Sequence, residues 1–119
     1  MMCMSNPQTR AVNICHYHVK PGHEAEMEVL LAKHWPALRK AGLASEEPPI
    51  IYRGLPSGKP GGDHGAEGTY IEIFSWAQPN GPQIAHQTPE VMAVWEPMGA
   101  ICTEMDFPLF EPLNLVAKG

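Results

Sequence analysis

His86 is the residue of this sequence best suited to proton transfer. It comes shortly before the Thr88-Pro89 pair, at which a helix is predicted to begin. A histidine near a helix start that faces a cavity can accept a proton from a bound molecule, because its reference pKa of about 6.5 is close to physiological pH. Asn13 and Tyr17 can donate hydrogen bonds that polarise a substrate carbonyl. The alternatives are a surface or helix-capping position for His86 and a satisfied core amide for Asn13.

Glu72 is a carboxylate in the middle of an apolar segment, between Ile71 and Ile73. Burying an unpaired carboxylate costs several kcal/mol, so we expect Glu72 to be paired or neutral. A salt bridge to Arg53 on the neighbouring strand is the interpretation that we favour. The other interpretation makes Glu72 a polar group of a substrate pocket.

Three aromatic residues provide flat surfaces for a ring-shaped ligand. Trp76 can stack against an aromatic substrate while its indole N–H orients a polar group, and Phe74 lies in the same row of its strand. Trp95 shares a helix face with Val91 and Met98, so it is also a candidate for the pocket wall. A closed hydrophobic core is the alternative for both tryptophans, and we favour it for Trp95.

His16 and His18 lie on the same face of a predicted strand, because alternate residues of a strand share a face. Together with His86 or Glu72 they can supply nitrogen and oxygen ligands to a metal ion. The alternative places both strand histidines in an interface between two copies of the chain. We favour the interface, and we predict no metal site.

Composition excludes several classes of protein. The net charge is -5, and the eight lysines and arginines are scattered along the 119 residues, so the positive surface needed to bind nucleic acid is not expected. No apolar run approaches the roughly 20 residues of a membrane-spanning helix, and the first ten residues lack the apolar stretch of a signal peptide. We therefore expect a cytoplasmic protein that does not bind membranes. Cys3, Cys15 and Cys102 have no CxxC spacing, so Cys15 and Cys102 are predicted to be buried, unreactive thiols.

These residues are positioned by a regular alternation of strands and helices. The predicted strands are 11–19, 50–53, 68–76 and 103–112, and the predicted helical regions are 22–42 and 82–101. Pro36 should kink or split the first helix, and Pro108 indicates a sheet edge or a bulge in the last strand. The order β-α-β-β-α-β predicts a ferredoxin-like α+β fold. We assign residues 10–113 to this single domain, with a disordered lead (1–9) and a tail (114–119).

The third strand is apolar on both of its faces. Ile71 and Ile73 lie on one side, and Tyr70, Phe74 and Trp76 lie on the other. Helices can cover only one of these rows, so the other needs a second sheet. A homodimer that packs sheet against sheet is the simplest arrangement that meets this need.

Three short segments resemble motifs of the antibiotic-biosynthesis-monooxygenase-like family of dimeric α+β barrels. They are Tyr17-His18-Val19-Lys20-Pro21-Gly22, Ile71-Glu72-Ile73-Phe74-Ser75-Trp76 and Ala85-His86-Gln87-Thr88-Pro89-Glu90-Val91. The resemblance covers about residues 11–112. It implies a dimer, and it implies one of the family's activities, which include cofactor-free oxygenation of quinols and polycyclic phenols and degradation of haem.

The sequence departs from the pattern of the family at three positions. Trp95 stands where haem-degrading members carry the haem-ligating histidine, and Cys15 stands where they carry an asparagine. Glu90 replaces the second histidine that members often carry in the second helix. We therefore expect no haem and no other cofactor.

Three functions follow from these observations. The first is a cofactor-independent monooxygenase that binds a small phenol or quinol, with His86 or a neighbour as the proton acceptor, Asn13 as a second catalytic residue, and a pocket formed by Tyr17, Glu72, Phe74, Trp76 and Trp95. The second is a non-enzymatic dimeric barrel that binds a small ligand or has a role in stress. The third is a metal-dependent site at His16, His18 and His86.

Overall fold

The computed structural model describes residues 11–56, 65–113 and 115. In these ranges the helices and strands are β1 (Val12–Val19), α1 (Glu24–Lys40), β2 (Ile50–Arg53), β3 (Thr69–Phe74), α2 (Gly81–Ala85), α3 (Pro89–Ile101), β4 (Cys102–Asp106) and β5 (Leu109–Phe110). The strands form one antiparallel sheet in the order β2-β3-β1-β4, and β5 also pairs with β1. This is the predicted ferredoxin-like α+β fold, with α2 and β5 as short additions. The predicted lead and the predicted tail, except residue 115, lie outside the described residues.

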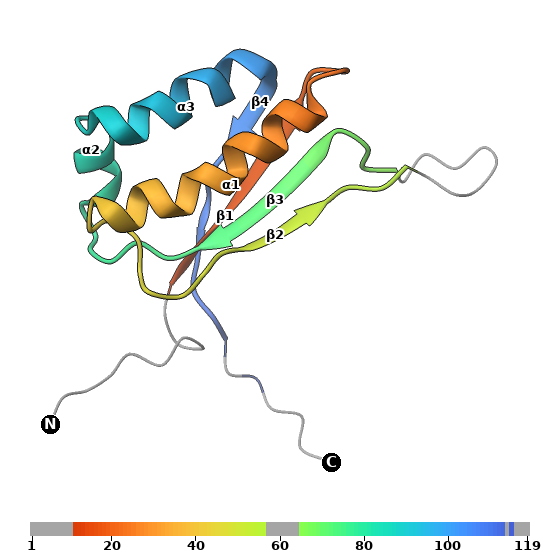
Figure 1. The fold of residues 1–119 in the computed structure, drawn as a ribbon. Coiled ribbons are helices and arrows are strands. Elements are labelled where there is room, and N and C mark those ends of the chain that lie inside the picture. Colours follow the sequence, from red (N-terminus) through yellow and green to blue (C-terminus); the bar gives the residue numbers. More distant parts are fainter. Residues whose placement is uncertain (1–10, 57–64, 114, 116–119) are drawn as a thin grey trace, which may run out of the picture.

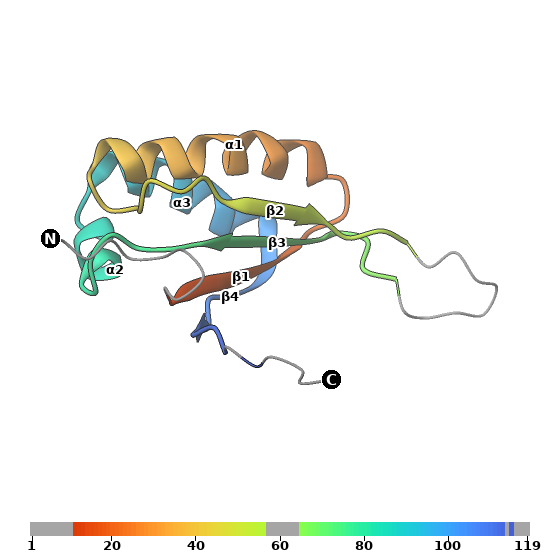
Figure 2. The same ribbon diagram turned by 90° about the horizontal axis from the view of Figure 1, so that it is seen from below.

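Helices α1 and α3 lie side by side on one face of the sheet (Figure 1). Viewed along the sheet, α1 and α3 form one layer and the strands a second one, and α2 lies at one end of the sheet (Figure 2). Alternate residues of β1 and β3 are buried, as the period of two requires. Cys15 and Tyr17 of β1 and Phe74 of β3 are thereby directed toward the helices, whereas His16 and Ile71 are directed to the opposite face. The core lies between the two layers.

Helix α1 begins and ends at residues that its sequence predicts. Acidic Glu24 and Glu26 lie in its first turn, and Gly42 follows its end with φ +75°, a conformation that glycine adopts at little cost. Pro36 was expected to kink or split the helix, and the split does not occur, because α1 continues through Pro36 to Lys40. The reason is its position, because Pro36 and Ala32 are both on the exposed side, where water can bond the Ala32 carbonyl.

The second helical region is divided in two, as predicted. Thr88 stands at the N-cap position of α3, but its hydroxyl donates a hydrogen bond to the Ile84 carbonyl (2.7 Å) and does not cap the helix. The last strand is interrupted at Pro108, which lies between β4 and β5. None of the helices in the described ranges has the length and apolar content needed to cross a membrane.

Candidate active site

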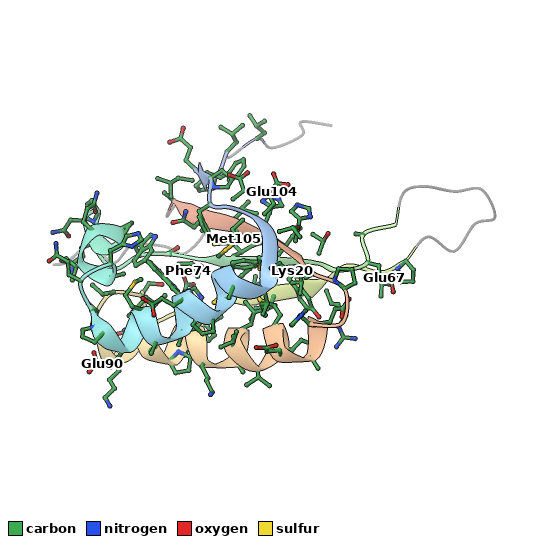
Figure 3. The ribbon with its side chains drawn as sticks, turned by 90° about the horizontal axis from the view of Figure 1, so that it is seen from above. Lys20, Glu67, Phe74, Glu90, Glu104 and Met105 are labelled. Atoms are coloured by element: carbon green, nitrogen blue, oxygen red, sulfur yellow. The ribbon has the colours of Figure 1, made fainter. Side chains whose placement is uncertain are left out.

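A cavity of about 420 Å³ lies between the sheet and the helices. Its volume falls in the range of small-molecule sites, roughly 300–1,000 Å³, and its walls are mostly apolar. It is lined by six of the residues that the sequence singled out, Asn13, Tyr17, Phe74, Trp76, His86 and Trp95. Phe74 of β3 and a further wall residue, Met105 of β4, are labelled in Figure 3.

Aromatic rings form much of the cavity wall and contact one another edge to face. The Phe74 and Trp76 rings are 5.1 Å apart between centroids, and the Trp76 and Trp95 rings are 6.5 Å apart. Each tryptophan is only partly buried. The expectation that Trp95 belongs to a closed core is therefore incomplete, because one side of its ring packs on the core and another lines the cavity.

A chain of buried hydrogen bonds runs along the wall of the cavity. The Tyr17 hydroxyl donates to Glu72 Oε1 (2.7 Å), and His34 Nδ1 lies 2.9 Å and 3.0 Å from the two carboxylate oxygens of Glu72. The Trp95 indole Nε1 donates to His34 Nε2 (2.8 Å). An indole N–H is a donor only, so Nε2 carries no proton and Nδ1–H donates to Glu72. His34 is therefore held as one neutral tautomer.

Glu72 is fully buried and does not pair with Arg53, so the salt bridge that we favoured from the sequence is wrong. The register of β2 on β3 places Ile51, not Arg53, opposite Glu72. Arg53 Nε instead lies 3.0 Å from Glu28 Oε2 on α1, and the Tyr70 hydroxyl donates to the same carboxylate (2.7 Å). The buried carboxylate of Glu72 is instead stabilised by Tyr17 and by a residue of α1.

That residue, His34, was missed by the sequence analysis. Val29 of α1 is 54% exposed and Trp35 is only partly buried, whereas the buried stripe of the helix contains Leu31, His34 and Leu38. The spacing of these three residues, i, i+3 and i+7, is helical. A histidine in register with two leucines is the signal that would have identified it.

Burial and the nearby carboxylate change the acidity of two wall residues. Burial, and secondly the charge of Glu72, raises the pKa of the Tyr17 hydroxyl well above its usual range. The same two causes raise the pKa of the Cys15 thiol to about 12. Both groups are therefore neutral at physiological pH, and Tyr17 remains a hydrogen-bond donor to Glu72. Cys15 and Cys102 are buried, as predicted.

His86 and Asn13, the two residues predicted to be catalytic, lie at different depths. His86 follows α2, is exposed, and packs its ring against Trp95 with 4.9 Å between centroids, which places it at the cavity mouth. Asn13 is buried on β1, and its amide donates to the Phe107 carbonyl (2.9 Å). This amide hydrogen bond agrees with the alternative of a satisfied core amide, although Asn13 also lines the cavity.

The strand histidines do not join His86. His16 and His18 lie in the row of β1 that faces away from the helices, whereas His86 lies on the helical side. His18 Nδ1 is 3.3 Å from the Thr69 hydroxyl. Among the residues that the structure describes, no three potential ligands gather at one point, so the metal-dependent hypothesis has no geometric support.

No family model and no curated protein matches the sequence. Solved structures do match. A variant of SnoaB, a cofactor-independent oxygenase from Streptomyces nogalater, aligns over 91% of this chain and 97% of its own, with TM-score 0.62 and 16% identity. A proposed antibiotic biosynthesis monooxygenase from Bordetella bronchiseptica aligns over 88% and 98%, with TM-score 0.65 and 18% identity. Rv0793 from Mycobacterium tuberculosis aligns over 90% and 98%, with TM-score 0.60 and 15% identity.

The chain has the fold of these proteins. The match extends over nearly the whole length of each solved chain. The predicted resemblance to the antibiotic-biosynthesis-monooxygenase-like barrels is thus confirmed at the level of the fold. At 15–18% sequence identity these matches do not show which residues are functional. The roles of individual residues are inferred from the geometry described above.

Proposed function

We propose that the protein is a cofactor-independent monooxygenase that acts on a small phenol-like or quinol-like molecule bound in the cavity. One observation carries this proposal. A cavity of about 420 Å³ with aromatic walls is lined by His34, which is a neutral imidazole. Its Nδ1–H donates a hydrogen bond to the buried carboxylate of Glu72, and its Nε2 carries no proton. The description of SnoaB as a cofactor-independent oxygenase supports the same reaction class.

The reaction needs little from the protein beyond binding and removal of a proton. A phenol or quinol that loses its hydroxyl proton becomes an electron-rich anion that can itself reduce oxygen. When a quinol becomes a hydroxyquinone, one ring C–H becomes C–OH and the two hydroxyl groups become carbonyls. The substrate thereby supplies four electrons, one atom of O₂ enters the product and the other leaves as water. The residues then have three tasks: Trp76 and Trp95 hold the ring, a histidine of the wall takes the proton, and apolar side chains exclude water.

We also infer that two copies pair through the open face of the sheet. Ile50 and Tyr52 are 53% and 57% exposed, and the register aligns them with Ile73 and Ile71 on this face. Contiguous apolar surface of this kind is typical of protein interfaces. Nδ1 of His16, in the same face, is buried without a hydrogen-bond partner among the described residues, and a second copy can provide one.

Oxygen consumption with naphthohydroquinone as the probe tests the proposed reaction. We expect uptake above the spontaneous rate in protein treated with a metal chelator, and we expect Trp76→Leu to remove most of it. Trp35→Leu is the matched control, because Trp35 is also a partly buried tryptophan but does not line the cavity. Binding of the probe without oxygen uptake would favour the non-enzymatic ligand-binding barrel instead.

A further inference from the structure

Two histidines, His34 and His86, line the cavity, and only His34 has the environment of a general base. The side chains of His34 and Glu72 are 3% and 0% exposed, and His34 Nδ1 contacts both carboxylate oxygens. Strand alternation directs Glu72 toward α1, and the buried stripe of α1 directs His34 toward Glu72. A second donor, the Tyr17 hydroxyl, fixes the carboxylate. An imidazole oriented by a buried carboxylate is the arrangement that many enzymes use to accept a proton at the other ring nitrogen.

The second ring nitrogen of this imidazole is bonded to another residue of the cavity wall. Its Nε2 atom accepts the indole N–H of Trp95, which is partly buried and lines the cavity, as His34 does. Nε2 has one lone pair in the ring plane, so it accepts one donor at a time. A phenolic hydroxyl can therefore reach Nε2 only by replacing the indole.

We propose that His34 is the proton acceptor of the oxygenase, with Glu72 as its positioning residue and Trp95 as a donor that the substrate displaces. This proposal rests on the proposed function. The phenolic O–H bond breaks, its proton forms a bond to Nε2, and its electron pair stays on the oxygen of the phenolate. The Glu72 carboxylate then stabilises the imidazolium through the Nδ1–H hydrogen bond.

His86 does not have this environment. It is exposed at the cavity mouth, and its closest described aromatic contact is with the Trp95 ring. The described side chains give it no carboxylate within ion-pair distance. Glu96, a further titratable residue of the cavity wall, is also exposed. Water therefore screens both groups, whereas it is excluded from His34.

Ionisation of bound para-nitrophenol tests the assignment without any oxygen chemistry. Below the pKa of the free probe, we expect wild-type protein to bind it as the coloured nitrophenolate. His34→Gln should bind the probe at least ten times less in its ionised form. Glutamine can still donate to Glu72 and accept from Trp95 but has no basic nitrogen, so this variant is expected to fold. His23→Gln, at the exposed start of α1, is the surface control and should match wild type.

Two further variants separate the alternatives. Trp95→Phe removes the donor that competes for Nε2, so the ionised fraction of bound probe should rise above that of wild type. Loss of ionisation in His86→Gln together with its retention in His34→Gln would overturn the proposal and make His86 the base. A probe that binds in the cavity but stays neutral in wild type also overturns it, whereas a probe that does not bind at all contradicts the proposed function itself.

The positioning role of Glu72 has its own readout. Nitrogen NMR of wild-type protein should show the His34 proton on Nδ1, as the hydrogen bonds require. In Glu72→Gln we expect the proton to stay on Nδ1, because the Trp95 indole still donates to Nε2, and the ionisation of bound probe to shift to higher pH, because a neutral amide stabilises the imidazolium less than a carboxylate does. An unchanged pH profile in this variant would show that Glu72 is only structural.

Discussion

Removing the Tyr17 hydroxyl should destabilise the fold far more than removing an equally short hydrogen bond at the surface. Tyr17→Phe keeps the ring, which packs edge to face on Phe107 with 5.9 Å between centroids, and deletes only the donor to Glu72. The carboxylate then keeps His34 as its remaining described donor. Because Glu72 is fully buried, water does not replace the lost hydroxyl.

The magnitude follows from the charge and burial of the acceptor. A hydrogen bond to a charged group contributes about 1.5–3 kcal/mol, and a buried acceptor that loses a partner retains its desolvation penalty. We therefore expect Tyr17→Phe to lower the free energy of unfolding by about 2–3 kcal/mol. For a domain of this length that corresponds to a fall in Tm of roughly 6–15 °C.

Urea denaturation followed by tryptophan fluorescence, with calorimetry for Tm, measures this loss. Tyr70→Phe is the matched control, because the Tyr70 hydroxyl also donates to a carboxylate at 2.7 Å, but that carboxylate, Glu28, is open to water and also pairs with Arg53. We expect a clearly smaller loss there. If Tyr17→Phe costs no more than Tyr70→Phe, the account of the buried hydrogen-bond chain is wrong.

Three further predictions concern reactivity, pH and assembly. Iodoacetamide should leave Cys15 unmodified in folded protein at pH 8 and modify it in urea, as peptide mass mapping would show, because a pKa of about 12 keeps the thiol protonated. The free energy of unfolding should fall as pH rises above about 9, because the unfolded chain releases the Cys15 proton there and the folded chain retains it. Urea titrations from pH 8 to 11 would measure this fall, and a free energy of unfolding that does not change over this range would contradict it. Ile73→Asp should shift sedimentation from dimer to monomer, whereas Val29→Asp, on an exposed position of α1, should not.

The sequence predicted the sheet well because its signals are local. Alternation in residues 11–19 and 68–76 identified β1 and β3, and Pro-Gly punctuation marked their ends. The start of a new helix at Thr88-Pro89 was also predicted from the sequence. Most of the predicted pocket residues lie on these elements, so the fold brings them to one cavity.

Predicting the centre of the site required two quantities that no local sequence signal determines. One is the rotation of α1 about its axis, which decides whether Trp35 or His34 faces the sheet. Because both faces of this helix carry apolar residues, the pattern did not distinguish them. The other is the register of β2 on β3, which separates Arg53 from Glu72. A shift of one residue would reverse the faces of that strand.

A crystal structure of the protein with para-nitrophenol tests the central claim most directly. We predict the probe ring in the cavity beside Trp76, its oxygen within about 3 Å of His34 Nε2, and the Trp95 indole moved away from that nitrogen. An empty cavity at saturating probe with the Trp95–His34 hydrogen bond intact, or probe bound only outside the cavity, would contradict the assignment of this cavity as the active site.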